Sequence, residues 1–189
     1  MEVPVEVSAR HVHLSEKDIK KLFGSDYKLT HKRNLSQPDQ FLCEERVELI
    51  GPKGIFESVA ILGPARSQTQ VEISITDSRK LGIEPFIRES GDLNGTAGCI
   101  LRGPNGEAKI ENGVIIAKRH IHMCTLDAKK IGTENGQICK VKIKTDSRAL
   151  IFDDVVVRVN DNFALAMHID TDEGNSANWN IGVKGTIIL

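Results

Sequence analysis

Short stretches of alternating apolar and polar residues recur along the chain. Examples are Val3/Val5/Val7, Val71/Ile73/Ile75 and Val141/Ile143. Residues two apart lie on the same face of a strand, so this alternation predicts strands with one buried face. Turn signals separate the stretches, namely Gly51-Pro52-Lys53-Gly54, Gly63-Pro64, Gly103-Pro104-Asn105-Gly106, Asn112-Gly113 and Asn135-Gly136. The pattern therefore predicts a mainly β fold built from many short strands.

Two segments show the longer period of an amphipathic helix. Residues 15–18 resemble a capping box, and the apolar residues Ile19, Leu22 and Phe23 follow before Gly24. Residues 126–131, which end at Gly132, look like a shorter copy of this helix. We therefore expect few and short helices. The acidic run at residues 170–173 is typical of a solvated loop.

The chain contains an internal duplication. Arg10-His11-Val12-His13 returns 109 residues later as Arg119-His120-Ile121-His122, and the match continues through an Asp and a Lys-Lys pair. Closed barrels are an economical way for many short strands to avoid exposed sheet edges. We therefore predict two small β-barrel domains related by duplication and capped by short helices. Residues 24–46 have no counterpart in the second half and are interpreted as an insertion.

The duplicated motif has the form of a metal-binding pair. In a strand, the two histidines of His-x-His point to the same face and can share one ion. The segments beginning at Ile55-Phe56 and Ile151-Phe152 match with an offset of 96, which puts Glu72 opposite His168. Each half then offers three ligands. Three protein ligands with one open position are typical of catalytic zinc. A single His-x-His is more often an ordinary surface or core pair, but its repetition favours metal.

Composition limits the other possibilities. The chain has 189 residues, with 40% hydrophobic and 27% charged content and a net charge of −1, as in an ordinary globular protein. Dispersed Lys and Arg and only 4% aromatic residues argue against nucleic acid as a partner. No apolar run is long enough to span a membrane, and the start lacks the apolar centre of a signal peptide. We expect a cytoplasmic protein whose four cysteines form no disulfide.

Several motifs together resemble the PduL-type phosphate propanoyltransferases, the phosphotransacylases of bacterial microcompartments and their relatives. The resemblance covers nearly the whole chain. It is carried by Ser8-Ala9-Arg10-His11-Val12-His13-Leu14, Gly63-Pro64-Ala65-Arg66, Gln68-Thr69-Gln70-Val71-Glu72, Glu89-Ser90-Gly91-Asp92, Lys118-Arg119-His120-Ile121-His122 and His168-Ile169-Asp170-Thr171-Asp172-Glu173 with Asn175.

The resemblance implies both a fold and an activity. The strand at residues 1–9 would complete a barrel built by residues 118–189, residues 10–117 would form the second barrel, and the active site would lie between them. The chain would form a homodimer. The reaction would interconvert a short-chain acyl-CoA, propanoyl-CoA or acetyl-CoA, and phosphate with acyl phosphate and CoA. Two zinc ions per chain would be held by His11, His13, Glu72, His120, His122 and His168.

Other polar residues are candidates for binding the substrates. Arg158 is the best candidate for a catalytic phosphate clamp, because a guanidinium matches phosphate oxygens. Arg66, Gln70, Ser90 and Asn175 resemble CoA-binding positions. Arg10 and Arg119 point away from the histidine face of their strands, and we expect them to form surface or interdomain salt bridges.

Two other functions remain open at this point, a zinc hydrolase and a non-catalytic module. A dinuclear zinc hydrolase of a thioester would use similar ligands. A metal-stabilised interaction module of a protein shell is the non-catalytic alternative. A double cupin would also carry His-x-His in β-barrels. It is disfavoured, because its Glu normally follows the histidine pair by a few residues, and Glu16 comes too early and lies in the predicted helix. Microcompartment residence is also open. Only ten residues precede His11, and their apolar alternation indicates a strand rather than an amphipathic targeting extension, so the bacterial cytoplasm is favoured.

Overall fold

The computed structural model describes residues 1–189 and divides the chain into two compact units. The C-terminal unit comprises residues 1–8, 36–38 and 118–189, and the N-terminal unit comprises residues 9–35 and 39–117. Each unit has its own buried apolar cluster. The expectation of a mainly β fold with two barrels is confirmed.

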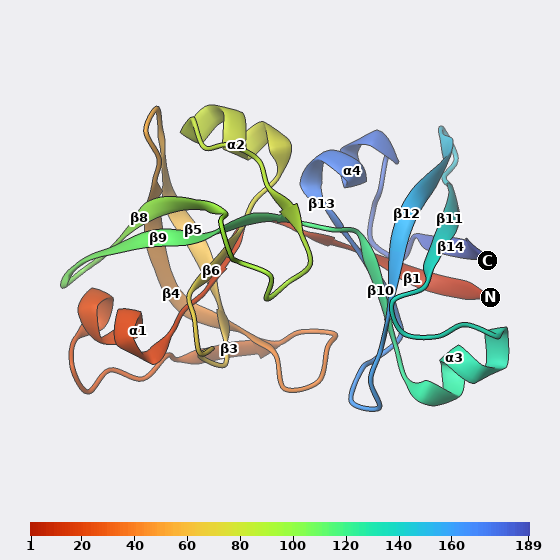
Figure 1. Ribbon diagram of the computed structural model, residues 1–189, viewed down its shortest axis with the longest axis horizontal. Helices are drawn as coiled ribbons and strands as arrows, with labels where there is room; N and C mark the ends of the chain where they lie inside the picture. Colours follow the sequence, from red (N-terminus) through yellow and green to blue (C-terminus); the bar gives the residue numbers. More distant parts are fainter. The chain divides into compact units, whose positions relative to one another are not determined.

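The C-terminal unit is a closed barrel of six strands. Its order is β1 (Glu2–Ser8), β13 (Ala166–Asp170), β10 (His120–Met123), β12 (Ala149–Val159), β11 (Ile138–Lys144) and β14 (Lys184–Ile188), which pairs back with β1. The first strand of the chain thus completes the barrel formed by the end of the chain (Figure 1). Alternate residues of these strands, among them Val3, Val5 and Val141, are fully or almost fully buried, as a period of two requires.

The N-terminal unit also closes a ring of six strands. The ring runs through β4 (Phe41–Ile50), β5 (Ile55–Gly63), β2 (His11–His13), β6 (Gln70–Glu72), β9 (Gly106–Ala117) and β8 (Ala97–Gly103), and β8 pairs back with β4. Two short strands extend it: β3 (His31–Asn34) pairs with β4, and β7 (Ile87–Arg88) pairs with β9.

The two rings repeat one arrangement around the histidine strands. In the N-terminal unit, β2 pairs in parallel with β5 and antiparallel with β6. In the C-terminal unit, β10 pairs in parallel with β12 and antiparallel with β13. The strand that precedes each histidine strand in the sequence belongs to the ring of the other unit. β1 precedes β2 but pairs with β13 in the C-terminal unit, and β9 precedes β10 but pairs with β6 in the N-terminal unit. The duplication is therefore structural as well as sequential.

Four short helices accompany the strands. The two expected from the sequence are present as α1 (Glu16–Phe23), capped by Ser15 and ended at Gly24, and α3 (Thr125–Ile131), ended at Gly132. No helix in the chain is both long and apolar enough to cross a membrane.

Two other helices lie where the sequence had predicted a strand and a loop. The apolar alternation at Val71/Ile73/Ile75 is not one strand, because β6 ends at Glu72 and α2 (Ile75–Leu81) begins after the cap residue Ser74. The acidic run at 170–173 is not a loop, since Asp170 caps α4 (Thr171–Ser176). Both helices start with a capping box, in which side chains satisfy the free N–H groups of the first turn.

Candidate functional site

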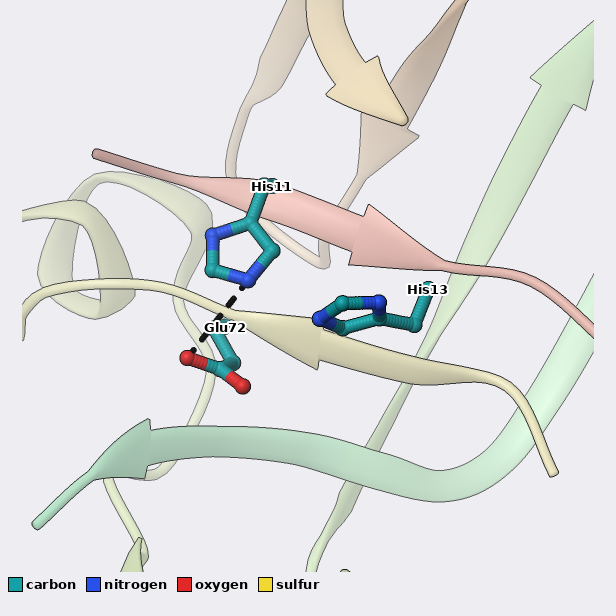
Figure 2. Close-up of side chains that lie close together, drawn as sticks. All are labelled: His11, His13 and Glu72. Atoms are coloured by element: carbon teal, nitrogen blue, oxygen red, sulfur yellow. Dashed lines mark ion pairs between the residues drawn. The ribbon is translucent and has the colours of Figure 1, made fainter. Parts of the chain in front are cut away.

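His11, His13 and Glu72 form a compact group inside the N-terminal unit. His11 and Glu72 are direct partners in the pairing of β2 with β6, and the two imidazole rings lie 5.0 Å apart between centroids. One ligand atom from each residue lies within 4.8 Å of the others, and Figure 2 shows the two rings and the carboxylate pointing toward one another. His11 Nε2 lies 3.5 Å from a carboxylate oxygen of Glu72. The group has the spacing of a metal site.

The C-terminal unit gathers His120, His122 and His168 in the same way. His120 and His168 are direct partners in the pairing of β10 with β13, the register position that His11 and Glu72 occupy in the other unit. The three ring centroids lie 4.6 to 5.3 Å apart. Of the two groups, the N-terminal one has a ligand atom from each residue within 4.8 Å of the other two.

The first histidine of each pair is held in one tautomer by the backbone. Nδ1 of His11 lies 2.9 Å from the carbonyl oxygen of Ala9, and Nδ1 of His120 lies 2.7 Å from that of Lys118. A carbonyl oxygen can only accept, so Nδ1 carries the proton and donates it in both rings. In the neutral form of such a ring the lone pair lies on Nε2, which is the usual arrangement of metal-ligating histidines.

The second histidine of each pair is buried and neutral. Burial, followed by the charges of His11 and Arg66, holds the pKa of His13 well below its usual range. Burial and the neighbouring His120, His168 and Arg158 lower the pKa of His122 to about 2. The Nδ1 atoms of both rings are buried without a hydrogen-bond partner. Neutral imidazoles are the form that binds metal, so the residues present fit an ion.

Three of the four expected CoA-binding residues form one hydrogen-bonded network beside His13. Arg66 donates from Nη1 to Ser90 Oγ at 3.1 Å and from Nη2 to His13 Nε2 at 2.9 Å. Gln70 donates to Ser90 Oγ at 2.9 Å and to Glu72 Oε1 at 2.6 Å. The backbone N–H of Gly91 donates to Gln70 Oε1 at 2.8 Å. A guanidinium, an amide and a hydroxyl thus surround the candidate ligands and can bind an anion there.

The remaining two expected residues lie in the C-terminal unit. Arg158 is on β12 as the direct partner of His122, and its guanidinium carbon lies 5.9 Å from the ring centroid of Phe163. Its charge is one cause of the lowered pKa of His122. Asn175 is exposed on α4 and is not part of the Arg66 network. The structure therefore puts a cationic side chain next to each histidine cluster.

Gln37 was missed by the sequence reading, which treated its segment only as an insertion. Its side chain is 4% exposed, and the amide donates to the carbonyl of Ala164 at 3.0 Å and accepts from the N–H of Ala164 at 3.3 Å. Gln37 Nε2 also lies 3.5 Å from Nε2 of His168. The only signal in the sequence was a polar run before Pro38.

A buried polar network, also missed, joins the ends of the two ligand strands in the N-terminal unit. Thr69 Oγ1 accepts from the N–H of Ser15 at 2.9 Å and donates to Asp18 Oδ2 at 2.7 Å. Burial alone would raise the pKa of Asp18, but hydrogen bonds from Thr69 and Ser15 and the ion pair with Lys21 lower it below the usual value. Ser15 follows β2 closely and Thr69 directly precedes β6, so the network connects the strands that carry the histidines and Glu72.

The fold and site define a two-barrel protein with duplicated histidine clusters that fit a metal ion and adjacent arginines that fit an anion. Comparison with known proteins specifies the family. The sequence profile of the phosphate propanoyltransferase family matches residues 4–180. The chain is 54% identical to a phosphate propanoyltransferase of Alkaliphilus metalliredigens over 188 residues, covering 100% of this chain and 88% of that protein.

Other relatives carry the same name. A phosphate propanoyltransferase of Thermotoga maritima is 53% identical over 178 residues, which cover 94% of this chain and 85% of that protein. One from Listeria monocytogenes is 50% identical over 186 residues, covering 98% and 87%. The chain therefore belongs to the phosphate propanoyltransferase family, which is a family of acyltransferases.

Proposed function

We propose that the protein is a zinc-dependent phosphate acyltransferase that interconverts propanoyl-CoA or acetyl-CoA and phosphate with the acyl phosphate and CoA. The observation that supports it most is the compact cluster of His11, His13 and Glu72, whose two imidazoles and one carboxylate are ligand types that fit Zn²⁺ in a member of this family. His120, His122 and His168 would hold a second zinc ion. Zinc bound to these residues would supply Lewis acidity toward an oxygen or a departing thiolate.

The reaction needs phosphate to attack in place of water. A phosphate oxygen forms a bond to the thioester carbonyl carbon, the C–S bond breaks, and CoA leaves as a thiolate. Arg158 would hold phosphate, because its planar fork can bind two oxygens and offset part of the charge. Arg66, Gln70, Ser90 and Asn175 would contact CoA, with the first three acting through the network beside His13.

Neither His13 nor His122 can serve as a general acid at neutral pH, since burial keeps both rings neutral. Buried cysteines are poor candidates for a nucleophile as well. Burial raises the pKa of Cys99 to about 12 and that of Cys139 to about 11, which leaves almost no thiolate. Direct transfer, without an acyl-enzyme, is therefore the route that we propose.

The activity is tested by measuring release of free thiol from propanoyl-CoA with and without phosphate. Release that requires phosphate supports acyl transfer, and detection of propanoyl phosphate identifies the product. Release that does not depend on phosphate would instead favour the zinc thioester hydrolase. Absence of release under both conditions in zinc-loaded protein would refute catalysis and favour the interaction module.

The metals are tested by elemental analysis of protein purified without chelator. We expect close to two zinc ions per chain, and close to one after His13→Ala or His122→Ala, with most activity lost in both variants. His31→Ala is the matched control, because His31 is exposed on β3 and its ring hydrogen-bonds to Asn34 in its own segment. Active protein with a reproducible zinc content near zero would refute the metal proposal.

The phosphate clamp is tested at Arg158. Losing one charge-assisted hydrogen bond costs about 1.5–3 kcal/mol, so Arg158→Ala should lower kcat/KM for phosphate about ten- to more than a hundredfold. Arg158→Lys keeps the charge and should mainly raise KM for phosphate. Arg148→Ala, an exposed arginine next to the same strand, is the control and should change little. If Arg158→Ala weakened only acyl-CoA binding, Arg66 would become the better clamp.

A further inference from the structure

An arginine directly precedes each histidine pair, and each one forms an ion pair inside its own unit. Arg10 donates to Asp77 twice, from Nε to Oδ2 at 3.0 Å and from Nη2 to Oδ1 at 2.7 Å. Arg119 Nε lies 3.0 Å from Glu173 Oε1. The salt bridges expected at these positions are confirmed, but they are not interdomain. The partners instead belong to the same unit as each arginine, and the carboxylate side chains are only 6% and 21% exposed.

Each arginine also contacts an aromatic ring on a neighbouring strand. The guanidinium carbon of Arg10 lies 4.2 Å from the ring centroid of Phe56 on β5, and that of Arg119 lies 5.4 Å from the ring centroid of Phe152 on β12. These two strands are the parallel neighbours of the histidine strands β2 and β10. The cation–π contact therefore links each histidine strand to one flanking strand.

The acids lie beyond the other flanking strand. Asp77 and Glu173 each follow the third residue of their histidine cluster, Glu72 or His168, by five positions. Both are the third residue of a short helix and complete its capping box. Each carboxylate thus fixes the start of α2 or α4 and binds the arginine as well. The ion pair therefore links the start of the histidine strand to the segment that follows the third ligand in the sequence.

The arrangement is repeated with the two offsets that relate the candidate ligands. Arg10 and Arg119 are 109 residues apart, as are His11 and His120. Three other pairs of positions are 96 residues apart, as are Glu72 and His168. They are the aromatic residues at 56 and 152, the capping residues at 74 and 170, and the acidic residues at 77 and 173. Ser74 is replaced by Asp170 and Asp77 by Glu173, so the interactions recur although the residue types differ. Chance surface ion pairs would not repeat in this way.

We propose that Arg10 with Asp77, and Arg119 with Glu173, are positioning residues that hold the first histidine and the third ligand of each metal site in register. The inference rests on the proposed metal sites. The arginine interacts on both sides of the histidine strand, and His11 faces Glu72 as His120 faces His168 in the register that these interactions support. Groups outside the ligands commonly alter metal affinity ten- to a hundredfold.

The test measures zinc dissociation constants by competition with a chromogenic chelator, and the unfolding of metal-free protein in parallel. Arg10→Met should weaken one of the two binding steps at least about tenfold and leave the other unchanged. Arg119→Met should weaken the other step, and the double variant should show both losses. Arg10→Lys should retain part of the affinity, because it keeps the charge but not the two parallel hydrogen bonds.

Controls separate positioning from general stability. Arg102 pairs with Glu48 and Glu107 in the N-terminal unit, away from the histidine strand, so Arg102→Met should leave both zinc constants unchanged. Arg10→Met leaves Asp77 buried without its partner. If that variant fails to fold, Arg10→Met combined with Asp77→Asn removes both charges and should show the same loss of affinity.

The outcomes distinguish this inference from the proposed function. Wild-type protein that binds two zinc ions, together with arginine variants whose zinc constants stay within about twofold, would overturn the positioning role alone. A loss of zinc affinity in Arg102→Met equal to that in Arg10→Met would also overturn the positioning role. Wild-type protein that binds no zinc would overturn the metal proposal and the positioning role with it.

Discussion

Replacing Thr69 with valine should destabilise the protein strongly although the two side chains have nearly the same shape. Thr69 is 2% exposed, and its hydroxyl accepts from the N–H of Ser15 and donates to the carboxylate of Asp18. Losing the hydrogen bond to the carboxylate costs about 1.5–3 kcal/mol, and leaving the Ser15 N–H unsatisfied costs roughly 1–3 kcal/mol. We therefore expect Thr69→Val to lower the free energy of unfolding by about 3–5 kcal/mol.

Urea denaturation followed by far-UV circular dichroism measures this loss, and hydrogen exchange at the Ser15 amide reports on the site itself. For a chain of this length the loss corresponds to a lower Tm by roughly 6–20 °C. Thr69→Ser is the matched control, because it keeps the hydroxyl and removes a methyl group worth about 1 kcal/mol. The reasoning is refuted if Thr69→Val loses less than 1 kcal/mol, or if Thr69→Ser loses as much.

The pH dependence of the Thr69→Val effect provides a second check. The folded-state pKa of Asp18 is lowered, so its interactions contribute stability above the unfolded-state value of 3.8 and lose it as pH falls through the folded value. The valine variant lacks the hydroxyl that helps to lower this pKa. The stability difference between wild type and variant should therefore be full at pH 7 and smaller at a pH acidic enough to protonate Asp18 in both folded proteins. An equal difference at both pH values would contradict the role of the carboxylate.

Three further substitutions test other parts of the structure. Cys139→Ser should keep turnover within about tenfold, a barrier change under about 1.4 kcal/mol, because burial raises the pKa of the thiol to about 11; a larger loss in folded protein would point to a cysteine-dependent mechanism. Gly98→Ala should cost more than about 2 kcal/mol, since a Cβ would lie 2.2 Å from a carbonyl oxygen of β9, and an unchanged Tm would contradict that clash. Gln37→Leu should cost about 2 kcal/mol through two lost hydrogen bonds to Ala164. Denaturation followed by Trp179 fluorescence, which reports on the C-terminal unit, measures it, and an unchanged midpoint would refute the role of the amide.

The sequence was informative where a period or a repeat was long enough to detect. The duplicated His-x-His located the strands β2 and β10, and the offset of 96 paired Glu72 with His168, which the structure puts at equivalent register positions. The helix α1 combined a capping serine, an amphipathic face and a final glycine. Each of these signals comes from residues close in sequence or from an exact recurrence, so one sequence suffices.

The features that were missed depend on local capping or on distant contacts. The helices α2 and α4 have only 7 and 6 residues, too few to show a helical period by themselves. The equally short α3 was recognised as a copy of α1, whereas α2 and α4 had no such template, and apolar alternation hid α2. The capping boxes at Ser74 and Asp170 decide these helices, and both could have been recognised from the acid three residues later. Gln37 could not have been found in this way, because its partner Ala164 is 127 positions away.

The two histidine clusters differ in their third ligand, which is Glu72 in one and His168 in the other. As ligand sets, His11, His13 and Glu72 offer two imidazoles and a carboxylate, whereas His120, His122 and His168 offer three imidazoles. An ionised carboxylate ligand would neutralise part of the charge of a divalent ion, which imidazole ligands do not do. Arg158 lies next to the histidine-only cluster and adds a further positive charge. Each cluster has an adjacent arginine, Arg66 or Arg158, so the carboxylate is the main difference in charge between them. Under the proposed function, the cluster without a carboxylate would repel a phosphate anion less, in line with the proposed role of Arg158. The duplication thus supplies two similar frames, and the exchange of a histidine for a glutamate gives them different ligand types.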